Sequence, residues 1–161
     1  MTDGTAIEPR FVNTRLESGD NAALVAVARA GAEAFGYTAT LRLDRQVAQL
    51  VRLRVAQINH CAYCLNVHHQ AASEAHIDPV KVRLLSAWWE TTLFTDRERA
   101  ALAYAERLTR ASEVSVEQPF QDAHDGLVEH FDSNEIVELV GVVINMNIWT
   151  RLKLAEGATP A

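Results

Sequence analysis

The chain has 161 residues, of which 48% are hydrophobic and 22% charged, and its formal net charge at pH 7 is −6. This length and composition fit a single soluble globular domain, and the acidic balance argues against binding to nucleic acid or to an anionic membrane. Apolar runs are far shorter than a bilayer-spanning helix, and no secretory leader is recognisable, so we expect a cytoplasmic protein with no membrane partner.

The first part of the chain differs in character from the rest. Residues 1–20 contain several glycine, proline and serine residues, and we expect them to form an irregular N-terminal arm. One domain should then occupy residues 21–161. Its first helix is predicted over residues 22–35, because a polar cap precedes this alanine-rich stretch and Gly36 follows it.

The remaining chain reads as a series of helices. Apolar residues recur at i, i+3 and i+4 spacing from about Arg42 to Ile58, which predicts a second helix. Start signals mark the later helices: Asp78-Pro79 before a helix to Ala87, Thr95 to Glu98 before one to Leu108, Ser115 to Gln118 before one to Phe131, and Asp132 to Glu135 before one over 136–154. No segment alternates as a strand would, so we predict an all-α fold.

The last predicted helix is apolar nearly all round. From residue 136 to residue 148 it presents hydrophobic side chains on every face, which indicates burial on several sides. In so small a chain this favours a homo-oligomer. The polar side chains of Asn145, Asn147 and Arg151 would then need hydrogen-bond partners.

Both cysteines lie in one short stretch, residues 59–69. Asn59 is a suitable N-cap, so we expect a helix to begin here with the cysteines in its first turn. On that helix Cys61 and Cys64 are i, i+3 neighbours, and Cys64 and His68 are i, i+4 neighbours. All three side chains therefore share one face of the helix.

This arrangement suits redox chemistry. Two cysteines one turn apart have a Cα separation of roughly 5 Å, which permits a disulfide. The helix N-terminus and a nearby imidazole both favour the thiolate and lower a thiol pKa from about 8.5 toward neutrality. We interpret Cys61, Cys64 and His68 as a reactive dithiol with its own base.

The cysteine pair admits three other interpretations. A closed zinc site needs four ligands, and in the absence of a second CxxC motif His60, His68 or His69 would have to complete it. The cysteines could also be inert core residues, as buried free cysteines often are. A thioredoxin-type site is disfavoured because no βαβ pattern surrounds the motif. The reactive dithiol is preferred, without a bound metal.

The segment from Leu50 to His68 resembles the core motif of the alkyl hydroperoxidase D (AhpD) / carboxymuconolactone decarboxylase superfamily. Residues 94–102 and 147–151 resemble further family segments, and the likeness extends over residues 24–154. It implies an all-α, AhpD-like fold that assembles into trimers or hexamers. It also implies reduction of a small hydroperoxide by the cysteine pair, with no bound cofactor and with electrons from an external dithiol reductant protein, lipoyl- or thioredoxin-like. The decarboxylase branch generally lacks the cysteine pair, so the chain resembles the peroxidase branch.

One position departs from the family pattern. The resemblance implies a proton-relay glutamate twelve residues before the first cysteine, and that position is Gln49 here. Glutamine can orient a neighbour by hydrogen bonding but cannot act as a base at neutral pH. Either Gln49 keeps the geometry while His68 alone moves the proton, or turnover is weakened, or another chain supplies the acid.

The expected roles follow from the motif. Cys64 would attack the peroxide as a thiolate, Cys61 would condense with the resulting sulfenic acid, and His68 would accept the thiol proton and protonate the leaving alkoxide. The helix-end argument alone would instead favour Cys61 as the more acidic thiol. Two other functions stay open: a lactone or small-acid decarboxylase on the same scaffold, and a non-catalytic redox-responsive oligomer, which Gln49 supports.

Overall fold

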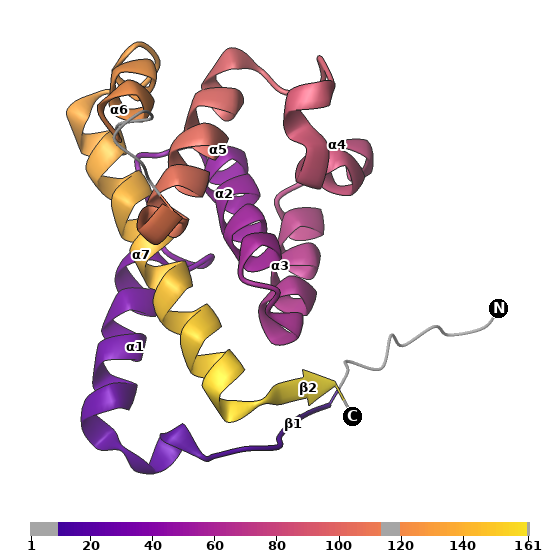
Figure 1. Ribbon diagram of the computed structural model, residues 1–161, viewed down its shortest axis with the longest axis vertical. Helices are drawn as coiled ribbons and strands as arrows, with labels where there is room; N and C mark the ends of the chain where they lie inside the picture. The colour runs from indigo at the N-terminus through magenta and orange to yellow at the C-terminus, as the bar shows by residue number, and fades with distance from the viewer. Residues whose placement is uncertain (1–9, 114–119, 161) are drawn as a thin grey trace, which may run out of the picture.

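The computed structural model describes residues 10–113 and 120–160, which are mostly helical (Figure 1). The α-helices are α1 Ala22–Phe35, α2 Arg45–Ile58, α3 Ala62–Glu74, α4 Pro79–Leu84, α5 Asp96–Thr109, α6 Phe120–Val128 and α7 Ser133–Glu156. Short 3-10 helices occupy η1 Ser18–Asp20, η2 Leu85–Glu90 and η3 Ala111–Glu113, and two strands occupy β1 Phe11–Asn13 and β2 Ala158–Pro160. The helical prediction is confirmed, and the strands correct its all-α form.

Local capping explains where most of the helices begin. The Asn21 side chain accepts a hydrogen bond from the Leu24 N–H at the start of α1, and Gly36 ends that helix as predicted. Thr95 and Asp132 each begin a helix with a complete capping box. Helix α2 begins three residues later than expected, because Asp44 caps it through the N–H groups of residues 46 and 47. The capping box predicted at Ser115 to Gln118 lies outside the described residues.

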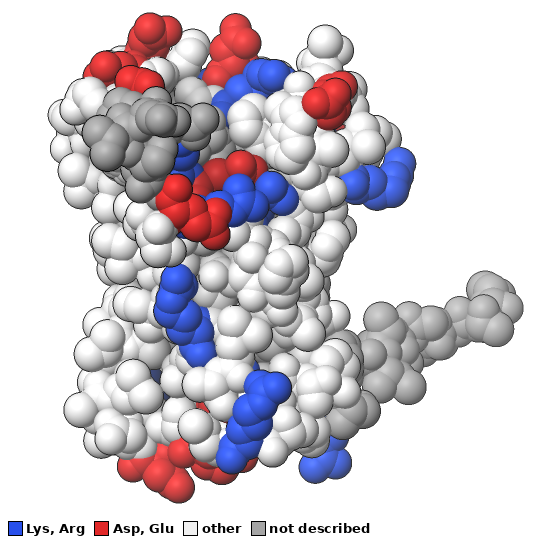
Figure 2. Space-filling model, viewed as in Figure 1, with Lys and Arg blue, Asp and Glu red and all other residues white. Residues whose placement is uncertain are grey.

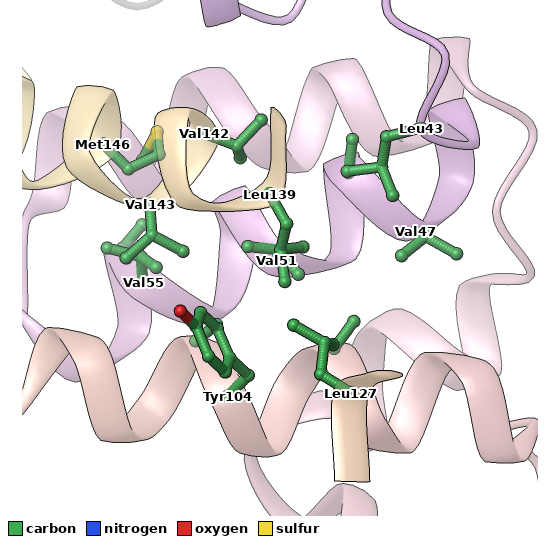
Figure 3. Close-up of a cluster of buried hydrophobic side chains, with 14 of the residues drawn as sticks. Leu43, Val47, Val51, Val55, Tyr104, Leu127, Leu139, Val142, Val143 and Met146 are labelled. Atoms are coloured by element: carbon green, nitrogen blue, oxygen red, sulfur yellow. The ribbon is translucent and has the colours of Figure 1, made fainter. Parts of the chain in front are cut away.

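Helix α2 is the centre of the fold (Figure 1). It packs against α3, α5 and α7, and every residue from Val47 to Ala56 is buried. One hydrophobic cluster joins α2 to α5, α6 and α7, and Figure 3 shows its side chains interlocking: Val47, Val51, Val55, Tyr104, Leu127, Leu139, Val142, Val143 and Met146. A second cluster lies on the opposite side of α2, around Leu50, Leu53, Leu85, Phe94 and Leu102.

Burial on all sides of α2 also encloses two of its arginines. Arg52 and Arg54 are both buried. Arg52 donates hydrogen bonds to the carbonyl oxygens of Phe35 and Gly36, each 2.9 Å away, where α1 ends. Arg54 pairs with Glu106 on α5, with a nitrogen–oxygen distance of 2.6 Å. The arginines therefore tie α2 to its neighbours through charge-assisted hydrogen bonds.

The two strands bring the ends of the described chain together beside α3. They pair antiparallel, with Phe11 opposite Pro160. The backbone N–H groups of Thr14 and Arg15 also bond to the carbonyl oxygen of Glu156. Strands of three residues are too short to show an alternating pattern, which is why they could not be predicted. The division into an arm of residues 1–20 and a domain of 21–161 stays a prediction.

Helix α1 lies at the edge of the molecule and packs chiefly against α7 (Figure 1). Ala28 is its one fully buried residue, and large apolar side chains on both helices are exposed: Leu24, Val27, Val137 and Ile144. Figure 2 shows that broad areas of one face of the molecule carry neither acidic nor basic side chains. Among the described residues, no helix combines the length and the apolar character needed to cross a membrane.

Candidate functional site

The cysteine helix begins two residues later than the sequence indicated. Cys61, not Asn59, is the N-cap of α3, and its sulfur accepts a hydrogen bond from the Cys64 N–H at 3.3 Å. His60 adopts a left-handed backbone conformation with φ of 53°, which turns the chain sharply between α2 and α3. The Asn59 amide nitrogen instead lies 3.2 Å from the side-chain oxygen of Asn147 on α7.

Cys61 and Cys64 are joined as a disulfide, with a Cα separation of 5.3 Å. Their i, i+3 spacing at the start of α3 produces this geometry. Both residues are buried, with exposed fractions of 1% and 3%. The two sulfurs nevertheless differ in what they face.

A cavity of about 210 Å³ lies beside Cys64. Cys64 and His68 border it from α3, and Asn145, Met146 and Trp149 border it from α7; its other walls are Ala32, Gly36, Tyr37, Thr38, Tyr63 and Val67. Cys61 is not among the lining residues, and none of the lining residues is charged. A small molecule in this cavity would therefore meet Cys64 and not Cys61.

Tyr63 links the cavity wall to the chain ends. Its ring packs edge-on against the Phe11 ring of β1, with centroids 4.6 Å apart. The Lys153 ammonium nitrogen lies 4.8 Å from the centre of the same ring. The small sheet and the end of α7 thus hold one wall of the cavity in place.

Gln49 determines how His68 is protonated. The Gln49 amide nitrogen lies 3.1 Å from His68 Nδ1 and 3.0 Å from the His68 carbonyl oxygen, and the glutamine is buried. A carbonyl oxygen only accepts, so the group facing both atoms is the NH₂ group and it donates twice. Nδ1 must then accept, and the neutral ring carries its proton on Nε2.

The surroundings keep this imidazole uncharged. Burial, with a smaller contribution from the positive charge of Arg52, lowers the pKa of His68 to about 3. The Tyr37 ring stands edge-on to the imidazole at a centroid distance of 5.8 Å. At neutral pH His68 therefore offers a hydrogen-bond donor at Nε2.

The structure thus brings the four residues singled out from the sequence, Gln49, Cys61, Cys64 and His68, into one region where α2 and α3 meet. Sequence reasoning did not place Asn145 or Trp149 there, although an asparagine in a nearly all-apolar helix was a usable signal. Among the described residues, no three histidine, cysteine, aspartate or glutamate side chains converge as metal ligands.

Known protein sequences resemble this chain. The model of the carboxymuconolactone decarboxylase family matches residues 26–107, about half of the chain. The uncharacterized protein YdfG of Bacillus subtilis (strain 168) is 29% identical over 121 residues, covering 75% of this chain and 80% of its own.

Two solved structures show the same fold. A candidate antioxidant defence protein AhpD of unknown function from Agrobacterium tumefaciens has a TM-score of 0.69 and 25% identity, over 86% of each chain. An uncharacterized peroxidase-related protein with an alkylhydroperoxidase AhpD core, from Ralstonia eutropha JMP134, has a TM-score of 0.69 and 18% identity, over 84% of this chain and 70% of its own. The matched segment contains the whole cysteine helix, and the chain belongs to the carboxymuconolactone decarboxylase family.

Proposed function

We propose that this protein is a thiol-dependent hydroperoxidase that reduces an organic hydroperoxide with Cys64 and Cys61. One observation carries the proposal: a cysteine pair that closes a disulfide has one member, Cys64, on an uncharged cavity that also holds a neutral imidazole. Family membership and the AhpD-like neighbours support it.

The reaction would proceed in two steps. The Cys64 thiol loses its proton to solvent, and the thiolate attacks one peroxide oxygen as the O–O bond breaks. The other oxygen leaves as an alkoxide, which takes up a proton from solvent to become an alcohol. Cys61 then displaces hydroxide from the Cys64 sulfenic acid, which gives the disulfide and water. An external dithiol, lipoyl- or thioredoxin-like, returns two electrons and two protons to the pair and is itself oxidised.

Access decides which cysteine attacks. The N-cap position of Cys61 places its sulfur at the positive end of α3, which favours the Cys61 thiolate. However, Cys61 does not border the cavity and Cys64 does. A peroxide must reach the sulfur it oxidises, so Cys64 is assigned the attack and Cys61 the resolving step.

The tautomer of His68 limits what the imidazole can do in the reaction. With Nδ1 accepting from Gln49, the Nε2–H group can donate to the departing oxygen but cannot take the thiol proton. Cys64 then has to ionise without a general base, so the reaction should be slow at neutral pH and faster as the pH rises. Gln49 is thus a positioning residue that favours donation over proton abstraction.

The cavity disfavours the decarboxylase alternative. Substrates of that class are small organic acids, and burial of a carboxylate is costly unless a cation pairs with it. No charged side chain lines this cavity. A decarboxylase would also keep its activity after both cysteines were replaced, which a cysteine-based peroxidase could not.

The decisive experiment is a single-turnover titration of the reduced protein with cumene hydroperoxide, followed by intact mass and a free-thiol count. We expect stoichiometric loss of both thiols. The Cys64→Ser variant should keep its remaining thiol, and the Cys61→Ser variant should accumulate a sulfenic acid that dimedone traps at Cys64. Absence of thiol loss over minutes, at pH 7 and at pH 9, would overturn the proposal.

A steady-state assay separates the redox-responsive oligomer from the enzyme. Dihydrolipoamide and reduced thioredoxin would be supplied in turn with excess hydroperoxide, and consumption of peroxide would be followed. A protein that forms the disulfide once and turns over with neither reductant is a redox-responsive protein rather than a peroxidase.

A further inference from the structure

Asn145 is a buried amide without a hydrogen-bond partner. It lies in the middle of α7 with an exposed fraction of 3%, and it lines the cavity beside Cys64 and His68. Its side-chain oxygen is enclosed and unpaired, and within the described residues its nitrogen makes no hydrogen bond either. Buried polar groups are nearly always paired, so this one needs an explanation.

The neighbouring amide on the same helix shows the contrast. The Asn147 nitrogen donates to the carbonyl oxygen of Val143 at 2.9 Å, and its oxygen accepts from Asn59 at 3.2 Å. Asn147 is not among the residues that line the cavity. The asparagine outside the cavity is thus fully paired, whereas the one that borders it is not.

Contact with α1 orients the Asn145 amide. A Cβ atom at position 31 would lie 2.8 Å from the Asn145 side-chain oxygen, so this oxygen lies directly against the glycine. The oxygen is therefore held against α1. The amide nitrogen, by contrast, is not enclosed, and the residue borders the cavity.

We propose that the Asn145 NH₂ group is the hydrogen-bond donor that binds the hydroperoxide and stabilises the oxygen leaving from it. This inference rests on the proposed function. Attack by the Cys64 thiolate sends the electron pair of the O–O bond to the departing oxygen, which then takes up a proton. The Nε2–H group of His68, from α3, and the NH₂ group of Asn145, from α7, are two uncharged donors available to that developing charge.

The cavity also indicates the class of substrate. Its walls include Trp149, Met146 and Tyr37, and it carries no charge that would bind an acid. Its volume of about 210 Å³ is below the roughly 300 Å³ at which cavities for drug-sized ligands begin. The fitting ligand is a compact, uncharged organic hydroperoxide with an apolar or aromatic group, in preference to a fatty-acid hydroperoxide.

The test compares Asn145→Leu and Asn145→Asp with Asn147→Leu as the matched control. Each reduced protein is mixed with cumene hydroperoxide, and the rate of thiol loss is measured. Alkylation by iodoacetamide is measured in parallel, because it reports the Cys64 thiolate without requiring a donor for a leaving oxygen. Thermal unfolding reports whether the residue is structural.

We expect Asn145→Leu to slow oxidation by cumene hydroperoxide about 10- to 100-fold, the value of a hydrogen bond to a charged group. It should be alkylated at the wild-type rate, and its melting temperature should not fall, because an unpaired buried amide has been removed. Asn147→Leu should melt earlier and react at the wild-type rate. If Asn145→Leu does not fold, the isosteric Asn145→Asp variant must show the slower oxidation by cumene hydroperoxide, because an ionised carboxylate cannot donate a hydrogen bond.

Two results would overturn the role of Asn145: unchanged peroxide oxidation in the Asn145 variants, or an equal fall in oxidation and alkylation. These results are distinct from failure of the proposed function. If the wild-type protein reacts with iodoacetamide but with no hydroperoxide, the peroxidase itself is wrong and the Asn145 role falls with it.

Discussion

A single amide group controls the chemistry of the histidine beside the cysteines. Gln49 donates to His68 Nδ1, and this donation leaves the ring proton on Nε2. A glutamate at position 49, which the family resemblance implies, would accept from Nδ1–H and leave a lone pair on Nε2. The side chain at position 49 therefore decides whether Nε2 of the neutral imidazole is a hydrogen-bond donor or a proton acceptor.

Gln49→Glu should therefore speed thiol oxidation. A general base contributes about 10²–10⁴-fold, so we expect the rate of thiol loss with cumene hydroperoxide at pH 7 to rise by at least the lower part of that range. Arg52 lies one turn further along α2, and its unpaired, buried Nε atom can compensate the new charge. Stopped-flow measurement of both proteins would check this.

Gln46→Glu is the control for this change. Gln46 is exposed on the same helix, and its replacement by glutamate adds the same charge away from His68. It should react like the wild type. Equal rates of thiol loss for Gln49→Glu and the wild type would mean that His68 does not accept the thiol proton even when a glutamate stands at position 49.

His68 should also make stability depend on pH. Its pKa is about 3 in the native state and about 6.5 when unfolded, so below pH 6.5 the unfolded chain binds a proton that the native protein does not. Stability due to this group is complete above pH 6.5 and is lost as pH falls toward 3, by about 1.4 kcal/mol per unit, or about 2 kcal/mol at pH 5.

Urea unfolding of the wild type and of His68→Gln between pH 5 and pH 7.5 would measure this effect. The wild type should lose stability on acidification more steeply than the variant. This pH range lies above the one in which Glu156 begins to contribute. Burial raises the pKa of Glu156, but the hydrogen bonds to Lys153 and Ser18 outweigh it and leave that pKa lowered. Parallel pH profiles would show that the imidazole is not held neutral.

At the scale of the elements, the site depends on close contact between α1 and α7. Gly141 of α7 lies against the ring of Phe35 at the end of α1. Gly31 of α1 lies against Asn145 in the same way, so two glycines, one on each helix, let the helices approach. The position of the Asn145 amide, and with it one wall of the cavity, follows from this approach.

Gly141→Ala should destabilise the protein although alanine is the better helix former. The added Cβ would lie 2.4 Å from a Phe35 ring carbon, and such overpacking typically costs about 1–3 kcal/mol. Gly126→Ala on α6 meets no atom within 4 Å and should instead stabilise by about 0.5–1 kcal/mol. Chemical denaturation would separate the two. A neutral Gly141→Ala would show that the Phe35 ring moves aside freely.

At the scale of the whole molecule, α1 and α7 expose large apolar side chains to solvent: Leu24, Val27, Val137 and Ile144. Of the fourteen residues of α1, one is fully buried. Val27 of α1 and Ile144 of α7 are 57% and 51% exposed. Large apolar side chains of this kind, on helices at the edge of a fold, are typical of contacts between subunits. The homo-oligomer stays a prediction, and this exposed side of α1 and α7 is where we expect its interface.

Sedimentation analysis should therefore give a mass above the 17.8 kDa of one chain. Val27→Glu and Ile144→Glu should each shift the protein toward the monomer, because a charge would be buried at the interface. Val128→Glu on α6, where the native valine is 50% exposed, should leave the mass unchanged. A monomeric wild type would mean that the exposed side serves no self-association.

What the sequence by itself determined is local. Caps at Thr95 and Asp132, the end of α1 at Gly36, and the spacing that brings Cys61, Cys64 and His68 to the first two turns of one helix all depend on residues within seven positions of one another. Such interactions are the same in any tertiary setting, so they can be recognised in the sequence alone.

Only the tertiary structure decided the rest. The pairing of β1 with β2, the two bonds from Gln49 to His68, the burial of Arg52 and the unpaired amide of Asn145 join segments that are distant in sequence. The start of α3 at Cys61 depended on the turn at His60. Gln49 and Arg52 are buried because α2 is enclosed by α3, α5 and α7. In every case the packing of elements against one another, not the pattern within one, determines which polar groups find partners.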